Sequence, residues 1–306
     1  YQQIQYILRL SEHKNFGKAS EACFVTQPTL SMQIKKAEET IGTKLFDRDT
    51  NPVEMTVFGE RLLPYLYETQ ADFGSIQRLI DESQGQYKQE IRIGIIPTVS
   101  AYLVPELFAR QKEFNTAINC VVKELKSEDL LEALKQKKID LGIMAGPVSK
   151  SHMATFPLYN EEIRAYIPDE KKKHVKVEKL EESHPWLLSK GNCLRTQMIH
   201  FCALEKGKQN EEWNYEGGNI EMLLKMVDKY GGYTLVPEFY KGIHDFKKSS
   251  LKHIYTENKE LNPARNIIGL VTHKNTKHPE IMNLLQHIKK EFSNKAPQKM
   301  EILSWK

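Results

Sequence analysis

Cysteine is scarce in this chain, with four among 306 residues, at positions 23, 120, 193 and 202. No pair follows the C-x-x-C spacing of a zinc or dithiol motif, and no histidines cluster with them, so we expect no metal site. The spacing also lacks the regular framework of a disulfide-rich secreted domain and fits a reducing compartment. No motif in the sequence calls for a cofactor, and we expect none.

Long hydrophobic runs are also absent. No apolar stretch reaches the roughly 18 residues that a membrane-spanning helix needs, so we expect no membrane partner. The first residues, Tyr1-Gln2-Gln3-Ile4, carry no basic and apolar secretion pattern, so we expect a cytoplasmic protein. Hydrophobic residues make up 40% and charged residues 27% of the 306 positions, which is typical of a folded protein with about two domains.

A broad excess of positive charge is missing where a nucleic-acid binder would need it. The whole chain has a net charge of +4, but residues 1–60 contain seven Lys or Arg and eight Asp or Glu. This segment therefore lacks the basic face that is usual for DNA-binding domains. Any attraction to phosphate must come from a few local cations, or from several copies acting together in an oligomer.

Residues 1–60 read as short helices joined by tight turns. A helix at 16–25, a short turn and a second helix opened by Pro28 follow the pattern of a helix-turn-helix. Leu30, Ile34 and Ala37 recur at spacings of four and three and are expected to face inward. The open face then carries side chains that hydrogen-bond to base edges and phosphates. The predicted DNA-binding residues are Gln27, Pro28, Thr29, Ser31, Gln33, Lys35 and, on a small hairpin at 45–56, Arg48.

A single long helix is predicted over residues 57–87. Its apolar positions step by four and three along one seam: Leu62, Leu66, Thr69, Phe73, Ile76 and Ile80. A helix with such a seam and no core of its own needs a partner, so we expect a homodimer through it. The seam could instead pack on the chain's own C-terminal region.

From residue 90 the pattern changes to alternating strands and helices. Predicted strands are 91–98, 118–122, 139–144, 163–167, 186–188, 233–236, 251–255 and 267–272, with helices at 105–111, 130–134, 193–206, 219–230 and 279–293. Such alternation predicts a mostly parallel sheet, and its length predicts two lobes with a cleft. Thr98 at the end of the first strand and Ser127 just past the second lie at the strand C-termini, the place where ligands bind in such folds.

The segment Cys193–Cys202 holds two thiols nine positions apart. Asn192 is a good helix N-cap, and a helix of this length would separate the thiols by about 13.5 Å on opposite faces. A disulfide needs Cα atoms within about 7 Å, so it would require the helix to be remodelled. We expect the helix N-terminus and Arg195 to lower the pKa of Cys193, whereas Cys202 reads as a buried thiol. Both cysteines could also be ordinary small core residues.

The N-terminal pattern resembles the winged helix-turn-helix of the LysR-type transcriptional regulators. The matching runs are Phe16–Ser20, Gln27–Ser31, Leu45–Arg48 and Thr56–Gly59. The resemblance covers the whole chain and implies an all-α winged helix-turn-helix domain (1–60), a long linker helix (57–87) and an α/β regulatory domain (90–306). That domain would have two lobes like a periplasmic binding protein, lobe I at about 90–162 and 267–306 and lobe II at about 163–266.

Further runs resemble the peroxide-sensing members of that family: Gly191–Arg195, Phe201–Cys202, Ile96–Val99, Tyr102–Pro105 and Ile268–Val271. The resemblance implies that peroxide oxidises Cys193, which then forms a reversible disulfide with the resolving Cys202. It implies a peroxide pocket of Thr98, Ser127, Asn192, Arg195 and Arg265. Asn192 stands where better-known members have His, and Ser127 where they have Thr.

The same resemblance implies partners for such a regulator of oxidative-stress genes. They are double-stranded operator DNA, further copies of the chain in a dimer or homotetramer, RNA polymerase, and a glutaredoxin or thioredoxin system that resets the thiols.

Two other functions stay open. The first is a LysR-type regulator that binds a small metabolite or anion between the lobes, with idle cysteines. The second is a thiol enzyme, but His200 would lie about 10 Å along the helix from Cys193, too far to act as its base. A helix-turn-helix domain is also hard to explain in such an enzyme, so we do not expect this protein to be an enzyme.

Overall fold

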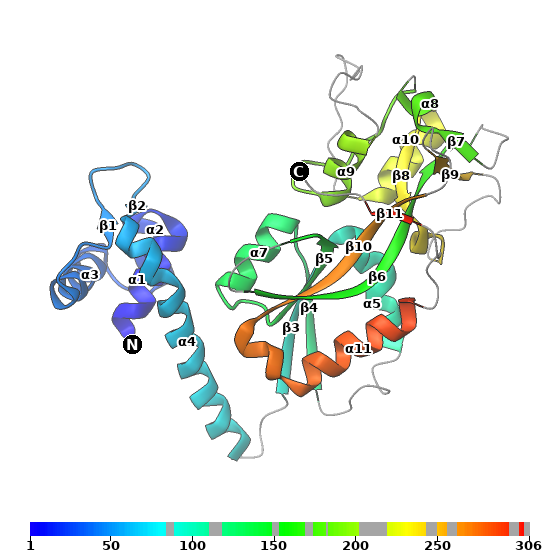
Figure 1. The fold of residues 1–306 in the computed structure, drawn as a ribbon. Coiled ribbons are helices and arrows are strands. Elements are labelled where there is room, and N and C mark those ends of the chain that lie inside the picture. Colours follow the sequence, from blue (N-terminus) through cyan, green and yellow to red (C-terminus); the bar gives the residue numbers. More distant parts are fainter. Residues whose placement is uncertain are drawn as a thin grey trace. The chain divides into compact units, whose positions relative to one another are not determined.

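The structure is a computed structural model that describes residues 1–83, 89–109, 118–148, 153–168, 174–181, 183–201, 219–242, 250–255, 262–293 and 300–302. The chain divides into two compact units, one formed by Tyr1–Lys88 with Lys135–Lys137 and one formed by Gln89–Leu134 with Lys138–Lys306. Figure 1 labels their elements. Within the described ranges, no helix combines the length and the apolar character needed to cross a membrane.

The first unit opens with the predicted helix-turn-helix. Its helices are α1 (Gln2–His13), α2 (Phe16–Ala22) and α3 (Gln27–Ile41). Side-chain oxygens cap two of them, since Asn15 accepts from the Lys18 amide and Thr26 from the Thr29 amide. Leu30 and Ile34 of α3 are fully buried against α1 and α2, as their spacing predicted.

A small hairpin and a long helix complete this unit. The hairpin pairs β1 (Phe46–Asp47) with β2 (Glu54–Met55), and α4 spans Val57–Ser83. Leu62 and Leu66 of the predicted seam pack on the helix-turn-helix core. Further along α4, Phe73 is 45% and Ile76 53% exposed, although the centre of the Tyr1 ring lies 4.6 Å from that of Phe73, so this part of the seam is only partly covered within its own unit.

The second unit is built on one curved sheet with the strand order β4-β3-β5-β10-β6-β9-β7, on which β8 pairs with β6 and β11 with β10. The strands are β3 (Gln89–Ile95), β4 (Ile118–Glu124), β5 (Leu141–Gly146), β6 (Met153–Tyr166), β7 (His174–Lys176), β8 (Thr234–Pro237), β9 (Leu251–Tyr255), β10 (Asn262–Thr272) and β11 (Met300–Ile302). The prediction of a mostly parallel sheet is wrong, because β10 runs antiparallel to both β5 and β6. Among the described strands, β3 pairs in parallel with β4 and β5, β7 with β9, and β10 with β11.

The helices of this unit are α5 (Pro97–Ala109), α7 (Ser127–Lys135), α8 (Val177–Glu181), α9 (Cys193–Phe201), α10 (Ile220–Tyr230) and α11 (Pro279–Ser293), with short 3-10 turns η2 (Glu238–Gly242) and η3 (His273–Lys277). Two predictions fail locally. Helix α5 begins at Pro97 rather than Pro105, because proline is favoured in a first helical turn. The strand predicted over 91–98 therefore ends before Pro97. Residues 186–188 do not form a strand; single bridges occur at Pro185, which pairs with Tyr233, and at Leu188.

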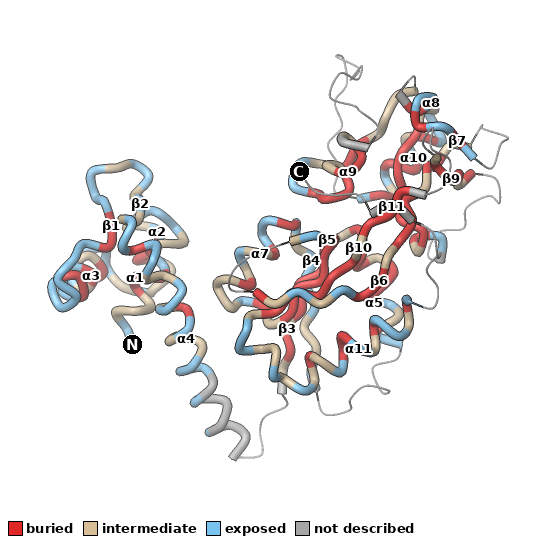
Figure 2. The backbone as a smooth tube through the Cα atoms, in the orientation of Figure 1, coloured by how far each residue is buried: buried red, intermediate tan, exposed pale blue. Residues whose placement is uncertain are grey.

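Two hydrophobic cores define the two lobes, and β6 runs through both (Figures 1 and 2). On β6, Leu158 packs in the first core and Ile163 in the second. Helix α9 lies where the cores meet: Cys193 packs in the first core, whereas the next residue, Leu194, packs in the second. A rearrangement of α9 would therefore disturb both lobes.

Candidate functional site

The loop before α9 sets the position of its first residue. Gly191 has φ +86°, a conformation that favours glycine, and its carbonyl oxygen accepts from the Ser127 amide at 3.4 Å. Asn192 lies directly before the helix, and its carbonyl oxygen accepts from the Arg195 amide at 3.1 Å. The Asn192 side-chain amide instead donates to Ser189, at 3.0 and 3.1 Å. The start of α9 is thereby fixed beside the start of α7.

Cys193 is a buried thiol, 2% exposed, in a polar setting. Burial raises the pKa of Cys193, and the Arg265 charge, the Ser127 hydroxyl, the Leu194 amide and the Thr98 hydroxyl pull it back part of the way. The Ser127 hydroxyl oxygen is buried and has no other partner among the described residues. The thiol is therefore mostly protonated at neutral pH, but its surroundings are arranged to hold a thiolate.

Arg265 supplies the positive charge and is itself fully buried. Its Nε donates to Glu161 Oε2 at 2.9 Å, its Nη1 to Thr98 Oγ1 at 2.8 Å, and its Nη2 to the Thr98 carbonyl at 3.1 Å. Glu161 and Arg265 are register partners on the antiparallel strands β6 and β10. Burial lowers the pKa of Arg265, but the Glu161 carboxylate, with Tyr102 and Cys193, more than offsets that and raises it overall, so the guanidinium stays charged.

Two tyrosines extend this network behind the ion pair. The Tyr102 hydroxyl donates to Glu161 Oε2 at 3.1 Å and lies 2.8 Å from the Tyr159 hydroxyl. Burial raises the pKa of both phenols well above the usual value, so they remain neutral. Polar groups from α5, β6, β10, α7 and the start of α9 therefore meet at one buried point between the lobes.

The structure places the residues of the predicted pocket as follows. Thr98, Ser127 and Arg265 act on the Cys193 sulfur, Asn192 directly precedes it, and the Arg195 guanidinium donates to the Leu188 carbonyl at 2.7 Å. The pKa of Cys193 is raised rather than lowered, because burial outweighs the favourable contacts. Cys202 lies outside the described residues, although α9 is helical through Phe201.

Sequence reasoning missed Glu161. A glutamate followed by another glutamate in an apolar strand reads as a surface residue, and its partner lies more than a hundred positions away. The available signal was the strand itself, since residue 161 lies two positions from Tyr159 and from Ile163, on the same face of a strand that is buried along much of its length.

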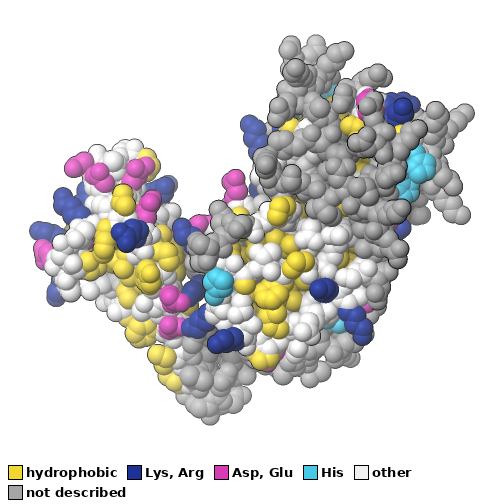
Figure 3. Space-filling model, in the orientation of Figure 1, with side chains coloured by type: hydrophobic (Ala, Val, Ile, Leu, Met, Phe, Trp, Pro, Cys, Tyr) yellow, Lys and Arg dark blue, Asp and Glu magenta, His cyan; other side chains and the backbone are white. Residues whose placement is uncertain are grey.

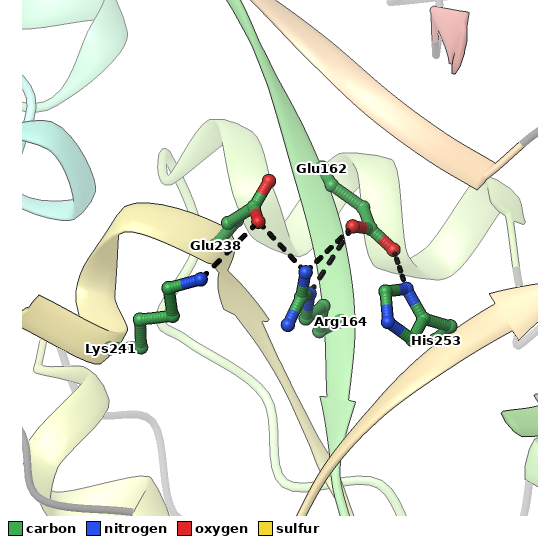
Figure 4. Close-up of polar contacts among 5 residues, drawn as sticks. All are labelled: Glu162, Arg164, Glu238, Lys241 and His253. Atoms are coloured by element: carbon green, nitrogen blue, oxygen red, sulfur yellow. Dashed lines mark hydrogen bonds and ion pairs between the residues drawn. The ribbon is translucent and has the colours of Figure 1, made fainter. Parts of the chain in front are cut away.

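The next residue, Glu162, points to the opposite face of β6, as strand geometry requires. Figure 4 shows its cluster: Arg164 donates to Glu162 at 3.1 Å and to Glu238 at 2.8 Å, His253 Nδ1 lies 2.6 Å from Glu162, and Lys241 lies 3.6 Å from Glu238. This second network joins β6, β9 and η2 within lobe II. It is a structural ion-pair cluster on the face of β6 away from the thiol.

The predicted DNA-binding residues, apart from Arg48, lie along α3. Gln27, Pro28 and Lys35 are exposed, and Thr29, Ser31 and Gln33 are half-buried. Arg48 lies on the hairpin, where it pairs with buried Glu38 of α3 at 2.9 Å and lies over the Phe16 ring. Acidic and basic side chains are interspersed on the visible face of this unit (Figure 3), as its near-neutral composition predicted.

Comparison with known families identifies both units. Residues 1–60 match the bacterial regulatory helix-turn-helix of the LysR family, and residues 84–293 match the LysR substrate binding domain. The chain belongs to the LysR family. It is thus a DNA-binding transcription regulator with a two-lobed regulatory domain, and the thiol site lies inside that domain.

Among curated LysR-family relatives, this chain is similar to a hydrogen peroxide-inducible genes activator of Haemophilus influenzae, at 27% identity over 77% of this chain and 79% of that protein. It is also 27% identical to the regulator EstR of Acinetobacter baylyi, over 90% of each chain. Among solved structures, a full-length OxyR variant of Pseudomonas aeruginosa superposes with a TM-score of 0.66 at 23% identity, covering 94% of this chain and 97% of that one. Full-length BenM gives 0.58 at 19% identity, over 97% of each chain. These superpositions show the shared LysR fold.

Within the described parts of this LysR-family chain, no group of three or more His, Cys, Asp or Glu side chains is arranged to hold a metal ion. The described cysteines, 23, 120 and 193, are all free thiols. Burial raises the pKa of all three thiols, but of these Cys193 alone has a guanidinium and two hydroxyl groups acting on its sulfur.

Proposed function

We propose that this chain is a transcription regulator that senses hydrogen peroxide through Cys193. The observation that carries the proposal is the buried thiol at the start of α9, with the Arg265 charge and the Thr98 and Ser127 hydroxyls acting on its sulfur. Peroxide is small and uncharged, and such a site offers hydrogen bonds to both of its oxygens. The relatives named as hydrogen peroxide-inducible genes activators support the same reading.

The chemistry takes two steps. The Cys193 thiolate attacks one peroxide oxygen, the O–O bond breaks, and the leaving hydroxide takes up the proton lost by the thiol, which gives water and a sulfenic acid. The Cys202 sulfur then attacks the Cys193 sulfur, the S–O bond breaks, and a second water leaves as the disulfide forms. A dithiol reductant of the glutaredoxin or thioredoxin class returns two electrons and two protons to restore both thiols.

The signal follows from the geometry of α9. The helix is regular from Cys193 to Phe201, and a helix of that length separates the ends by more than the roughly 7 Å that a disulfide spans. Bond formation therefore requires α9 to unwind. Because Cys193 packs in one lobe's core and Leu194 in the other's, unwinding repacks both lobes. The disulfide acts as a covalent ligand that exists only in the remodelled state.

The regulatory unit acts on a DNA-binding unit that reads operators with α3. Gln27, Thr29, Ser31, Gln33 and Lys35 present hydrogen-bonding groups along that helix, with Arg48 beside it. The exposed part of the α4 seam supports a homodimer, and dimers would assemble into tetramers on paired half-sites. In the cytoplasm, the oxidised form would regulate oxidative-stress genes together with RNA polymerase.

The test combines mass and DNA binding. One equivalent of peroxide should reduce the intact mass of the native protein by two hydrogens and change its operator footprint. Cys193→Ser should abolish both changes while keeping operator binding, and Cys202→Ser should stop at the sulfenic acid. A Cys193→Ser protein that still responds to peroxide would overturn the proposal and leave the metabolite-gated regulator in its place.

A further inference from the structure

The buried guanidinium of Arg265 faces two acidic groups. One is the Glu161 carboxylate, 2.9 Å from Arg265 Nε, and the other is the Cys193 thiol, on which the Arg265 charge acts. Glu161 and Arg265 are both 0% exposed, and Cys193 is 2% exposed. Water does not screen the interactions between these three groups, so the charge state of each strongly affects the others.

We infer that Glu161 is a positioning residue that competes with the Cys193 thiolate for the single Arg265 cation and thereby holds back the reactivity of the sulfur. When Glu161 is ionised, the buried pair is neutral overall, and little positive charge remains to stabilise a thiolate. The same carboxylate fixes the guanidinium, so that Nη1 and Nη2 both reach Thr98, at 2.8 and 3.1 Å. Glu161 therefore orients the cation and at the same time reduces its effect.

The two tyrosines of this network do not compete for the Arg265 charge. Tyr102 and Tyr159 stay neutral, because burial raises the pKa of both phenols well above the usual value. The Tyr102 hydroxyl donates to Glu161 Oε2 and so favours the ionised carboxylate. Burial opposes it and raises the pKa of Glu161 overall.

The inference predicts a substitution that activates the thiol. Glu161→Gln keeps the size of the side chain and an acceptor oxygen for Arg265 Nε and Tyr102 but removes the negative charge. The thiolate of Cys193 then becomes the main counter-ion of Arg265. An opposite charge at short range shifts a pKa by about one unit or more, which corresponds to about tenfold more thiolate below the midpoint. A lower pKa also reduces nucleophilicity, so the peroxide rate should rise by about threefold.

The experiment is a thiolate titration of the full chain. The ultraviolet absorbance of the thiolate is followed against pH, and each variant is compared with the same variant carrying Cys193→Ser, so that only Cys193 is measured. Glu162→Gln is the matched control: it is the adjacent buried glutamate, also 0% exposed, but it pairs with Arg164 on the opposite face of β6. We expect the midpoint to fall in Glu161→Gln and to stay unchanged in Glu162→Gln.

A double variant tests whether Glu161 acts through Arg265. In an Arg265→Gln background, adding Glu161→Gln should no longer lower the midpoint. If Glu161→Gln alone does not fold, Glu161→Asp serves instead, because its shorter side chain lengthens the 2.9 Å contact and should give a smaller shift in the same direction. A midpoint that stays or rises, or a shift that persists without Arg265, overturns the inference.

This inference deepens the proposed function and rests on it, yet the two fail separately. If the midpoints move as expected but peroxide leaves native Cys193 unoxidised, the charge competition stands and peroxide sensing is wrong. If native Cys193 is oxidised but the Glu161→Gln midpoint and rate are unchanged, peroxide sensing stands and the competition is wrong.

Discussion

The reactivity of Cys193 depends on a balance that single residues can shift. Burial raises the pKa of the thiol, while Arg265, Ser127, the Leu194 amide and Thr98 oppose that effect. With these opposing effects, the thiol stays protonated and unreactive until the groups around it stabilise negative charge on the sulfur. Burial also keeps larger oxidants and alkylating agents away, so selectivity for a small molecule follows from the same feature.

At this scale, Thr98→Val tests the hydrogen bonding of the thiol. Valine has the shape of threonine but lacks the hydroxyl, so Arg265 Nη1 loses its acceptor at 2.8 Å and the thiolate loses a donor. A hydrogen bond to a charged group is worth about 1.5–3 kcal/mol, so we expect peroxide oxidation of Cys193 to slow by about tenfold or more. Stopped-flow kinetics with residue-resolved mass analysis measures this rate.

The control for that variant is Thr234→Val. Thr234 is also buried, at 1% exposure, and its hydroxyl donates to the Trp186 carbonyl at 2.9 Å, away from the thiol. It should lower the stability of lobe II and leave the peroxide rate within about twofold, since no charge near Cys193 changes. Equal slowing in both variants would show that Thr98 acts only through stability.

Glu238 gives a pH-dependent prediction. Burial raises its pKa, against the opposing charge of Arg164, so the native protein retains a proton that the unfolded chain has released. Stability from this group is therefore present below the unfolded pKa and is lost as pH rises through the native one. Urea unfolding gives the free energy of unfolding of the native protein and of Glu238→Gln from pH 4 to 8. We expect the native protein to lose stability relative to the variant as pH rises. A difference independent of pH would contradict it.

At the scale of elements, β6 and β10 decide where the site forms. These two strands run antiparallel and place Glu161 opposite Arg265, while alternation sends Glu162 to the other face. One strand thereby serves two separate networks, the thiol site and the lobe II ion-pair cluster. The division of roles depends on register, so a bulge or slip in β6 between these residues would exchange them.

The hairpin of the DNA-binding unit depends on one carboxylate. Glu38 is 8% exposed, and its Oε1 accepts from the Leu45 amide at 2.8 Å and the Phe46 amide at 3.2 Å, while Oε2 pairs with Arg48. Glu38→Ala leaves these donors unsatisfied and should reduce the stability of the hairpin region by about 3 kcal/mol. Hydrogen exchange of residues 38–56 measures the loss.

Arg48→Met is the matched variant, because it removes the other half of that ion pair. Arg48 is 35% exposed, so its loss should cost about 1 kcal/mol or less. If Arg48→Met proves as damaging as Glu38→Ala, the ion pair rather than the two amide contacts holds the hairpin in place.

Sequence patterns predicted the elements better than the pairing between them. Helical spacing correctly predicted the buried positions of α3, and strand and turn signals located most strands. The antiparallel pairing of β10 escaped prediction because strand direction depends on partners distant in the chain. Arg195 was expected to act on the thiol because it lies two positions along the chain, and its guanidinium donates to the Leu188 carbonyl. The positive charge that acts on the thiol comes from Arg265 on β10, a residue distant in the sequence.

At the scale of the whole molecule, sensing and DNA binding are functions of different units of one LysR-family chain. The first carries the exposed seam of α4, and the second carries a helix shared by two cores. Oligomerisation through α4 would bring two recognition helices onto one operator and multiply the weak local charge of each.

Ile76→Glu tests the α4 seam. Ile76 is 53% exposed, and a charge there should weaken self-association by about tenfold or more, because it would be buried in the dimer. Sedimentation velocity over a concentration series measures the change. Gly74→Glu is the control, since a side chain at Gly74 meets nothing within 4 Å and lies off the seam. Unchanged association in Ile76→Glu would show that α4 is not the dimer contact.

The central claim is that oxidation and the intact α9 helix exclude each other. Hydrogen exchange over residues 193–201, measured on reduced protein and on protein treated with one equivalent of peroxide, tests it most directly. We predict that the oxidised sample carries a Cys193–Cys202 disulfide and that these amides, protected when reduced, exchange rapidly. A sample without that disulfide, or one that carries it while the amides stay protected, would contradict the account.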